Sequence, residues 1–284
     1  MSLTLMYITN NPVTAKIAED AGVDRIWIDM EYIGKGERQG GMDTVKNHHT
    51  IEDIKRLRQV VTKSDLMVRI NPIHDATSEY CSSEEEINQT IDAGADIIML
   101  PMFKTTQEVE KFVKYVNGRA KVQLLVETAE AAENIDSILE IGGIDEIHIG
   151  LNDLHLSYNL TFMFELLSDG TIDTLAEKFK AAGIPFGFGG IASLGRGILP
   201  SEYVVREHYR LGSTATILSR SFCNVHKIQD LRLIRRIFRD GVAQIRDLEA
   251  ECAEYAADSD YFAENARTVA QKVRRICDGL VEVR

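Results

Sequence analysis

The chain has 284 residues, enough for one large α/β domain, and 44% of them are hydrophobic and 27% charged, as in soluble globular proteins. The 32 Lys and Arg residues against 44 Asp and Glu residues give a net charge of −12, which argues against binding to nucleic acid or an anionic membrane. The N-terminus is too short and polar for a signal peptide, no apolar run approaches the roughly 20 residues that span a membrane, and the four cysteines are scattered. We therefore expect a cytoplasmic protein with reduced thiols.

Segments typical of strands and helices alternate along the chain in eight units. The predicted strands are residues 3–8, 25–31, 66–71, 96–102, 122–126, 144–149, 185–190 and 213–219. Helices are predicted between them, one of which begins behind Thr50, a suitable N-cap, and another of which ends at Gly212. Such alternation implies a parallel sheet, and eight units imply a closed (β/α)8 (TIM) barrel of about 250 residues.

The chain continues beyond what such a barrel needs. We assign residues 1–240 to the barrel and 241–284 to a C-terminal helical arm rich in Ala, Glu and Arg. Apolar residues recur along the arm, at Ile245, Leu248, Cys252, Val269, Val273 and Ile276. This stripe predicts that the arm packs on another surface, for example that of a neighbouring subunit, whereas a solvated helical tail is the alternative.

Carboxylates follow two consecutive strands in the middle of the chain. Glu127 ends the fifth strand, and Asp153 follows the sixth strand after the residues Gly150-Leu151-Asn152. A right-handed crossover makes these strands parallel and brings both carboxylates to the same edge of the sheet. Paired carboxylates at that edge are suitable ligands for a hard divalent cation such as Mg²⁺ or Mn²⁺. The alternative is that each carboxylate only caps the helix that follows it.

The other strands also end in residues that suit a binding site, which in such barrels lies at this edge. The strand ends carry carboxylates, an arginine, polar side chains and glycines: Asp29, Glu31, Arg69, Asn71, Glu127, Asn152, Asp153, Gly189, Gly190, Ser219 and Arg220. Arg69 is predicted to bind an anionic substrate, or else to pair with Asp29 or Glu31. The glycine-rich segment 187–192 is predicted to bind a carboxylate or phosphate, or else to let the strand bend or pack closely. His148, within the sixth strand, is predicted as a core residue or one behind the site.

Five segments at the strand ends carry a resemblance to a known family. They read, in chain order, IDME, VRIN, DAGADIIMLPM, LLVETAEAAENID and IHIGLNDL. Residues 25 to about 223 resemble the HpcH/HpaI aldolase/citrate lyase family, a group of phosphoenolpyruvate/pyruvate-binding barrels. The resemblance implies a (β/α)8 barrel, a divalent metal held by Glu127 and Asp153, and a substrate-binding role for Arg69. It also implies a homo-oligomer, a trimer or a hexamer.

The sequence departs from this family after the second strand, where Tyr32 occupies the position of a histidine that is usual next to the glutamate. The loop that follows brings four further charged or ring side chains to the same rim: Arg38, Asp43, His48 and His49. We predict His49 as the general base, because a pKa near 6.5 suits proton transfer at neutral pH, with Glu31 and His48 as alternatives. Alternatively, His49 has only a structural role, either packing within the loop or starting the next helix.

These residues, together with the resemblance, predict a metal-dependent carbon–carbon lyase of the class II aldolase type. It would cleave or form a 2-oxo acid, such as a 4-hydroxy-2-oxo acid, through the enolate of pyruvate. Glu127 and Asp153 would hold Mg²⁺, Mn²⁺ or another divalent cation, and the substrate would contact Arg69, Asn152, Gly189 and Gly190. The alternatives are a citrate-lyase-like lyase that acts on an acyl-CoA, and a barrel that serves as a non-catalytic scaffold.

Overall fold

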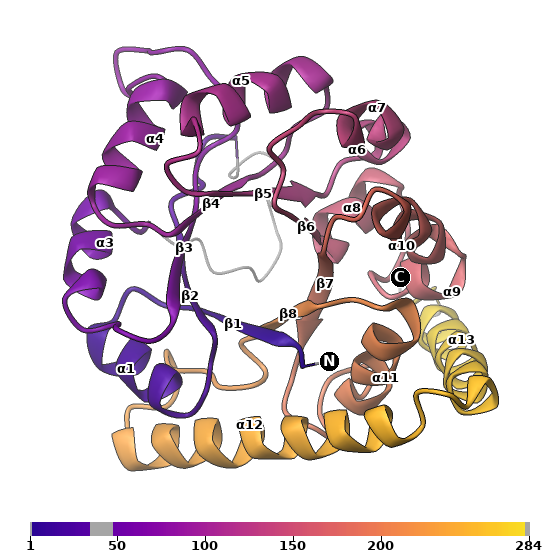
Figure 1. Cartoon of the computed structure of the whole chain (residues 1–284). Helices are drawn as coiled ribbons and strands as arrows, with labels where there is room; N and C mark the ends of the chain where they lie inside the picture. Colours follow the sequence, from indigo (N-terminus) through magenta and orange to yellow (C-terminus); the bar gives the residue numbers. More distant parts are fainter. Residues whose placement is uncertain (1, 35–47, 282–284) are drawn as a thin grey trace.

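Eight parallel strands form a closed barrel in the order β1 to β8, and the helices surround it (Figure 1). The computed structural model describes residues 2–34 and 48–281. The barrel strands are β1 (Thr4–Ile8), β2 (Arg25–Asp29), β3 (Asp65–Arg69), β4 (Ile97–Leu100), β5 (Lys121–Val126), β6 (Glu146–Ile149), β7 (Phe186–Ile191) and β8 (Ala215–Leu218). Each of them overlaps a predicted strand, so the predicted (β/α)8 barrel is confirmed.

The helices that cover the barrel are α1 (Pro12–Asp20), α3 (Ile51–Arg58), α4 (Ser83–Asp92), α5 (Thr106–Val116), α6 (Ala129–Glu133), α7 (Ile135–Leu139), α8 (Leu151–Ser157), α9 (Glu165–Ser168), α10 (Thr171–Ala181) and α11 (Ser201–Leu211). The predicted N-cap of α3 is confirmed, because the Thr50 side chain and the Asp53 side chain form a capping box. The short helices α8 and α9 were not predicted from the sequence. In the part of the chain that the structure describes, no helix is long and apolar enough to span a membrane.

The strands are apolar because both of their faces are buried. Their outward side chains pack under the helices in the main core. Their inward side chains form a second, smaller cluster that fills the barrel: Met6, Trp27, Met67, Ile97, Met99, Leu125 and Ala215. Below this cluster the Arg25 guanidinium donates to Glu146 Oε1 at 2.6 Å. These side chains fill the lower barrel, and a ligand site is therefore expected above them, at the carboxyl ends of the strands.

The C-terminal arm consists of α12 (Leu231–Glu254) and α13 (Ser259–Val281). In Figure 1 α12 lies across α1 and α11, and α13 lies beside α9 and α11. The predicted apolar stripe is largely buried by this packing, at Ile245, Leu248, Cys252, Val269 and Val273. The stripe thus packs on the barrel of its own chain. The predicted boundary at residue 240 lies within α12, and the predicted oligomerisation through the arm stays a prediction.

Candidate active site

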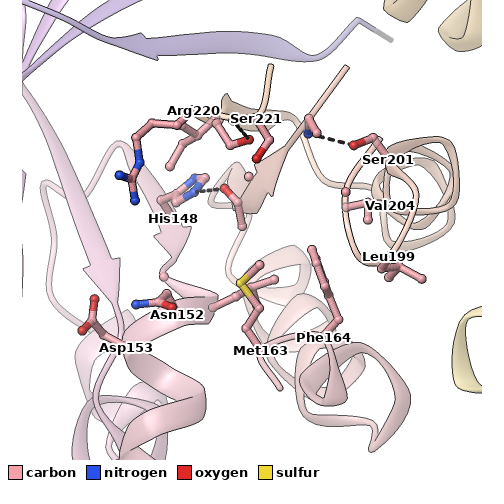
Figure 2. Close-up of a pocket in the computed structure, with 18 of the residues that line it drawn as sticks. His148, Asn152, Asp153, Met163, Phe164, Leu199, Ser201, Val204, Arg220 and Ser221 are labelled. Atoms are coloured by element: carbon pink, nitrogen blue, oxygen red, sulfur yellow. Dashed lines mark hydrogen bonds between the residues drawn. The ribbon is translucent and has the colours of Figure 1, made fainter. Parts of the chain in front are cut away.

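A cavity of about 440 Å³ opens at the carboxyl ends of the strands (Figure 2). Its walls come from β1, β2, β3, β5, β6, β7 and β8 and from the loops that follow these strands. Six of the residues that we predicted for the site lie in these walls: Arg69, Glu127, Asn152, Asp153, Gly189 and Gly190. The structure therefore brings together, from four different strand ends, the two predicted metal ligands and the four predicted substrate contacts.

The two carboxylates lie in the same wall without capping a helix. Glu127 directly follows β5, is 2% exposed, and accepts a hydrogen bond from the Met102 backbone N–H at 3.1 Å. Asp153 is half-buried in the first turn of α8. The N-caps of the adjacent helices are instead Thr128, for α6, and Gly150, for α8. The alternative explanation of these carboxylates as helix caps is therefore wrong.

The electrostatics around Glu127 suit a cation. Burial raises the pKa of Glu127 well above its usual range, Asp153 and Glu31 raise it further, and Arg69 acts to lower it. Two carboxylates with excess negative charge between them fit a divalent cation, since Mg²⁺ is commonly held by one or two carboxylates and completes its shell with substrate oxygens and water. Among the residues that the structure describes, no cluster of three or more His, Cys, Asp or Glu side chains is placed to bind a metal ion.

Gly150 makes the approach of the sixth strand to Glu127 possible. Its backbone N–H donates to the Val126 carbonyl oxygen at 3.0 Å, which continues the β5–β6 pairing to the level of the carboxylate. A Cβ at position 150 would lie 2.9 Å from both Cβ and Oε2 of Glu127. Such a distance is too short for a stable contact, so a side chain at this position would displace Glu127. We did not single out this glycine from the sequence.

Arg69 is held by two carboxylates and still lines the cavity. Its Nε and Nη2 donate to the two oxygens of Asp29 at 2.8 and 2.9 Å, and Nη1 lies 3.3 Å from Glu31 Oε2. The guanidinium also lies over the ring of Trp27, 5.3 Å from its centroid. Burial acts to lower the pKa of Arg69, but Asp29 and Glu31 outweigh it and raise the pKa, so the side chain stays charged. Both functions considered from the sequence, ion pairing and access to a ligand, are compatible in this geometry.

The predicted catalytic residues other than Arg69 lie behind or beside the cavity. Glu31 is buried and contacts Arg69. His49 is buried between two other cavities, and its Nδ1 accepts a hydrogen bond from the Asp29 backbone N–H at 3.0 Å. That ring nitrogen is therefore engaged with β2. Glu31 thus helps to hold Arg69 itself, and His49 contacts Asp29, which also holds Arg69. Neither residue lies in the wall that contains Glu127 and Asp153.

The residue that replaces the family histidine points away from this cavity. The ring of Tyr32 contacts those of Tyr80, at 5.4 Å between centroids, and His48, at 6.2 Å. These three side chains line a separate cavity of about 510 Å³, together with Asn71. Two other residues that we predicted at this rim, Arg38 and Asp43, lie outside the described part of the chain.

The glycine-rich strand β7 forms another wall. Its pairing with β8 shifts register between Gly187 and Gly190, and Gly189 has a φ of +54°, which favours glycine. A Cβ at Gly187 would lie 2.4 Å from the Ala215 carbonyl oxygen, so the predicted close packing is real there. The Gly189 carbonyl accepts from His148 Nε2 at 3.2 Å. Burial lowers the pKa of His148 to about 4. The ring, predicted as a core residue or one behind the site, is fully buried and lines the inner wall of the cavity.

The remaining wall was not predicted from the sequence. It comes from the α8–α9 connection, with Phe162, Met163 and Phe164, and from the segment before α11, with Ile198 and Leu199. Figure 2 shows Met163 next to Asn152, and Phe164 beyond it on the side of Leu199. The only signal in the sequence is the apolar content of the run YNLTFMF, which has neither a strand nor a helix period.

Comparison with known proteins relates the chain to one family. Residues 3–164 match the model of the HpcH/HpaI aldolase/citrate lyase family. The 2-keto-3-deoxy-L-rhamnonate aldolase of Escherichia coli (strain K12) is 24% identical over an alignment of 209 residues that covers 63% of this chain and 70% of that protein. That of Shigella dysenteriae serotype 1 (strain Sd197) has the same identity and coverage.

Solved structures share the fold. The crystal structure of a HpcH/HpaI aldolase/citrate lyase family protein from Burkholderia cenocepacia J2315 has a TM-score of 0.61 at 16% identity, and the match covers 82% of this chain and 95% of that one. The citrate synthase SbnG has a TM-score of 0.59 at 18% identity, with 83% and 94% covered. At identities this low, the TM-scores show that these proteins share the barrel fold.

Proposed function

Because this chain belongs to the HpcH/HpaI aldolase/citrate lyase family, we propose that it cleaves or forms a 4-hydroxy-2-oxo acid through the enolate of pyruvate. The predicted enzyme class, a carbon–carbon lyase of the aldolase type, is confirmed by the family match and by the aldolase relatives. One observation carries the finer proposal: Glu127, Asp153 and Arg69 line one cavity at the mouth of the barrel.

We assign Glu127 and Asp153 as the ligands of a divalent cation, Mg²⁺ or Mn²⁺. The place of both carboxylates in the walls of one cavity supports this assignment. Burial is the main cause of the raised pKa of Glu127, and the negative charge of Asp153 adds to it. When bound, such a cation acts as a Lewis acid toward substrate oxygens, an effect that typically contributes several kcal/mol to transition-state stabilisation.

The reaction requires that negative charge be stabilised on an oxygen. In the cleavage direction a base takes the proton of the 4-hydroxyl group, the bond between C3 and C4 breaks, and an aldehyde leaves. The electron pair of that bond passes to the enolate of pyruvate, which is then protonated at C3. We assign Arg69 to the enolate oxygen, because Asp29 and Glu31 hold its guanidinium in place before the reaction begins. A preorganised donor of this kind needs no reorganisation during the reaction.

Other predicted residues receive supporting roles. Asn152 is exposed beside Asp153 at the cavity mouth, where its amide group can contact a substrate carboxylate (Figure 2). Gly189 and Gly190 line the wall formed by β7, where a substrate can approach the backbone closely. Because Glu31 and His49 contact Arg69 and the Asp29 backbone, we assign them as positioning residues.

The assignment is tested with the variants Glu127→Gln and Asp153→Asn, which keep the side-chain shape and remove a charge. Thermal unfolding is measured with Mg²⁺ or Mn²⁺ and oxalate, a mimic of the pyruvate enolate. The free energy of unfolding of the wild-type protein should rise by about 2.7 kcal/mol when the ligand concentration is 100 times Kd. In each variant this rise should be lost. Aldol activity should fall by at least about a hundredfold, as expected when several kcal/mol are removed.

A matched control is Glu133→Gln, which removes a carboxylate from an exposed position at the end of α6. It should leave both the stabilisation by metal and oxalate and the aldol activity unchanged. If Glu127→Gln kept the stabilisation and the activity of the wild-type protein, the metal assignment would be wrong.

A further inference from the structure

We propose that the aldehyde half of the substrate carries an apolar substituent, which the side chains of Phe162, Met163, Phe164 and Leu199 receive. This inference rests on the proposed function, in which pyruvate occupies the end of the cavity near Glu127 and Arg69. It concerns only the half of the substrate that leaves on cleavage or adds in the reverse reaction.

The cavity is larger than pyruvate requires. A water molecule, which has one heavy atom, occupies about 30 Å³ in the liquid. On that scale the six heavy atoms of pyruvate fill less than half of a cavity of about 440 Å³, so a second group of similar or larger size fits beside it. The charged residues Arg69, Glu127 and Asp153 gather in the walls formed by β3, β5 and α8. The space that remains lies toward the α8–α9 connection and α11.

The side chains that face this remaining space are apolar and well held. Phe162 and Phe164 are 7% and 4% exposed, and their rings contact each other at 5.4 Å between centroids. Leu199 and Val204 are buried on the other side. In Figure 2 Met163 and Phe164 point into the space between α8 and the segment that carries Leu199 and Val204. The surface is therefore set before a substrate arrives.

Two of the hydroxyl groups near this surface already take part in hydrogen bonds. Ser201 Oγ accepts from the Ala192 backbone N–H at 2.7 Å and donates to the Arg196 carbonyl oxygen at 3.4 Å. Ser219 Oγ accepts from the Ser221 backbone N–H at 3.2 Å. A chain of substrate hydroxyl groups placed here would give up hydrogen bonds to water and find few new ones, which is unfavourable. An alkyl or aryl group loses nothing and gains contact with the aromatic and aliphatic side chains.

The mouth of the cavity offers a different possibility, which the experiment includes. Arg220 and Ser221, from the loop after β8, lie above the apolar surface in Figure 2. An aldehyde with a carboxylate could contact that arginine. The cavity walls next to Met163 favour the apolar substituent, so we expect the carboxylated aldehyde to be the poorer substrate.

The test measures kcat/KM for aldol addition of pyruvate, with Mg²⁺ or Mn²⁺, to three kinds of aldehyde: butanal, glyceraldehyde and glyoxylate. Deuterium exchange into the methyl group of pyruvate is measured in parallel, because it requires only the pyruvate half. We expect exchange, and a preference for butanal over both other aldehydes of at least about tenfold, since single apolar groups in a pocket contribute about 10- to 200-fold.

Variants separate the contribution of the surface from the intrinsic reactivity of the aldehydes. Met163→Gln should lower the ratio of butanal to glyceraldehyde by about tenfold, whereas Met163→Leu, which keeps an apolar side chain of similar volume, should keep the ratio. Ile198→Gln, at an exposed position in the same wall, gives a second measurement should Met163→Gln fail to fold; it should lower the ratio in the same direction.

The outcomes distinguish this inference from the proposed function. If no deuterium exchange occurs with any of the metals, the proposed function itself fails. If exchange occurs but glyceraldehyde or glyoxylate is preferred, or if the ratio is the same in Met163→Gln and Ile198→Gln as in the wild-type protein, the pyruvate chemistry stands and the apolar subsite is refuted.

Discussion

Gly150 lies directly behind Glu127, and the space between them is too small for a methyl group. Its φ of −81° is one that any residue adopts, so Gly150→Ala does not strain the backbone. The added Cβ would instead push the Glu127 carboxylate away from Asp153. We expect the affinity for Mg²⁺ or Mn²⁺ with oxalate to fall by at least about tenfold, as measured by calorimetry, while the barrel stays folded.

Gly142→Ala is the matched control for this prediction. Gly142 is exposed, has an ordinary φ, and has no atoms within 4 Å of the position of a Cβ. The control should bind the cation as the wild-type protein does. Equal affinity in Gly150→Ala would mean that Glu127 can move without loss, and that it is not a ligand of the cation.

His49 gives a second prediction at the scale of a single residue. If its function is to accept the hydrogen bond from the Asp29 N–H, His49→Leu leaves that buried donor without a partner and costs about 1–3 kcal/mol of unfolding free energy. His49→Asn retains an acceptor and should recover most of this stability. Both variants should keep the shape of the pH profile of kcat/KM, because Arg69 and the two carboxylates are unchanged.

The alternative function of His49 makes a different prediction. Loss of a general base typically reduces the rate by about 10²–10⁴ and alters the acid limb of the pH profile. Such a loss in His49→Asn, in a variant as stable as the wild-type protein, would return His49 to the catalytic role that the sequence suggested.

At the scale of secondary-structure elements, Glu19 connects α1 to the turn before β3. Its Oε1 accepts from the backbone N–H groups of Thr62, Lys63 and Ser64 at 2.6 to 3.0 Å, and Oε2 accepts from Lys16 Nζ. Burial acts to raise the pKa of Glu19, but these hydrogen bonds outweigh it and lower the pKa to about 2. One carboxylate thus satisfies the backbone of a turn that has no regular pairing of its own.

We expect Glu19→Gln to lower the free energy of unfolding by about 1–3 kcal/mol at neutral pH, because hydrogen bonds to a charged acceptor are lost. The pKa in the folded state is below the value of 4.5 for an ordinary glutamate, so the stabilisation is present above pH 4.5 and is lost as the pH falls toward 2. Urea unfolding at several pH values should therefore show the two proteins converging over this range. A difference that stays constant down to pH 2 would contradict the proposed linkage.

At the scale of the whole molecule, the C-terminal arm is part of the folded barrel. α12 and α13 pack on α1, α9 and α11, and hydrogen bonds join the two layers. Asn265 Nδ2 donates to Glu207 Oε1 at 2.7 Å, and Arg206 Nε donates to the Tyr261 hydroxyl at 2.7 Å. Buried apolar and polar contacts of this kind predict that the arm and the barrel unfold together.

Ile245→Ala tests this coupling, since Ile245 lies in α12 and is fully buried. The free energy of unfolding of the variant should be lower by about 2–5 kcal/mol, as is usual when a buried isoleucine is replaced by alanine, and the variant should unfold in a single transition. Arg275→Ala, at an exposed position of α13, should change stability by less than about 0.5 kcal/mol. Two separate transitions, with only the first one shifted in Ile245→Ala, would show an arm that folds independently of the barrel.

Much of the fold and part of the site follow from the sequence by itself. Short apolar runs such as 122–126 predict buried strands, and their alternation with helical segments predicts a parallel barrel, because these periods are local properties of the chain. The rule that parallel strands end at one edge then places Arg69, Glu127 and Asp153 together without knowledge of any loop. The family resemblance rests on the same strand ends.

Only the tertiary structure decided which way the side chains of the loops face. It turned Tyr32 into a separate cavity, placed His49 against the backbone of β2, and built an apolar wall from residues 162–164. It also revealed that a side chain at Gly150 would displace Glu127, a contact between residues that follow different strands. Loops have no period to read, and their conformations depend on contacts with residues far away in the chain, so such directions are absent from the sequence pattern.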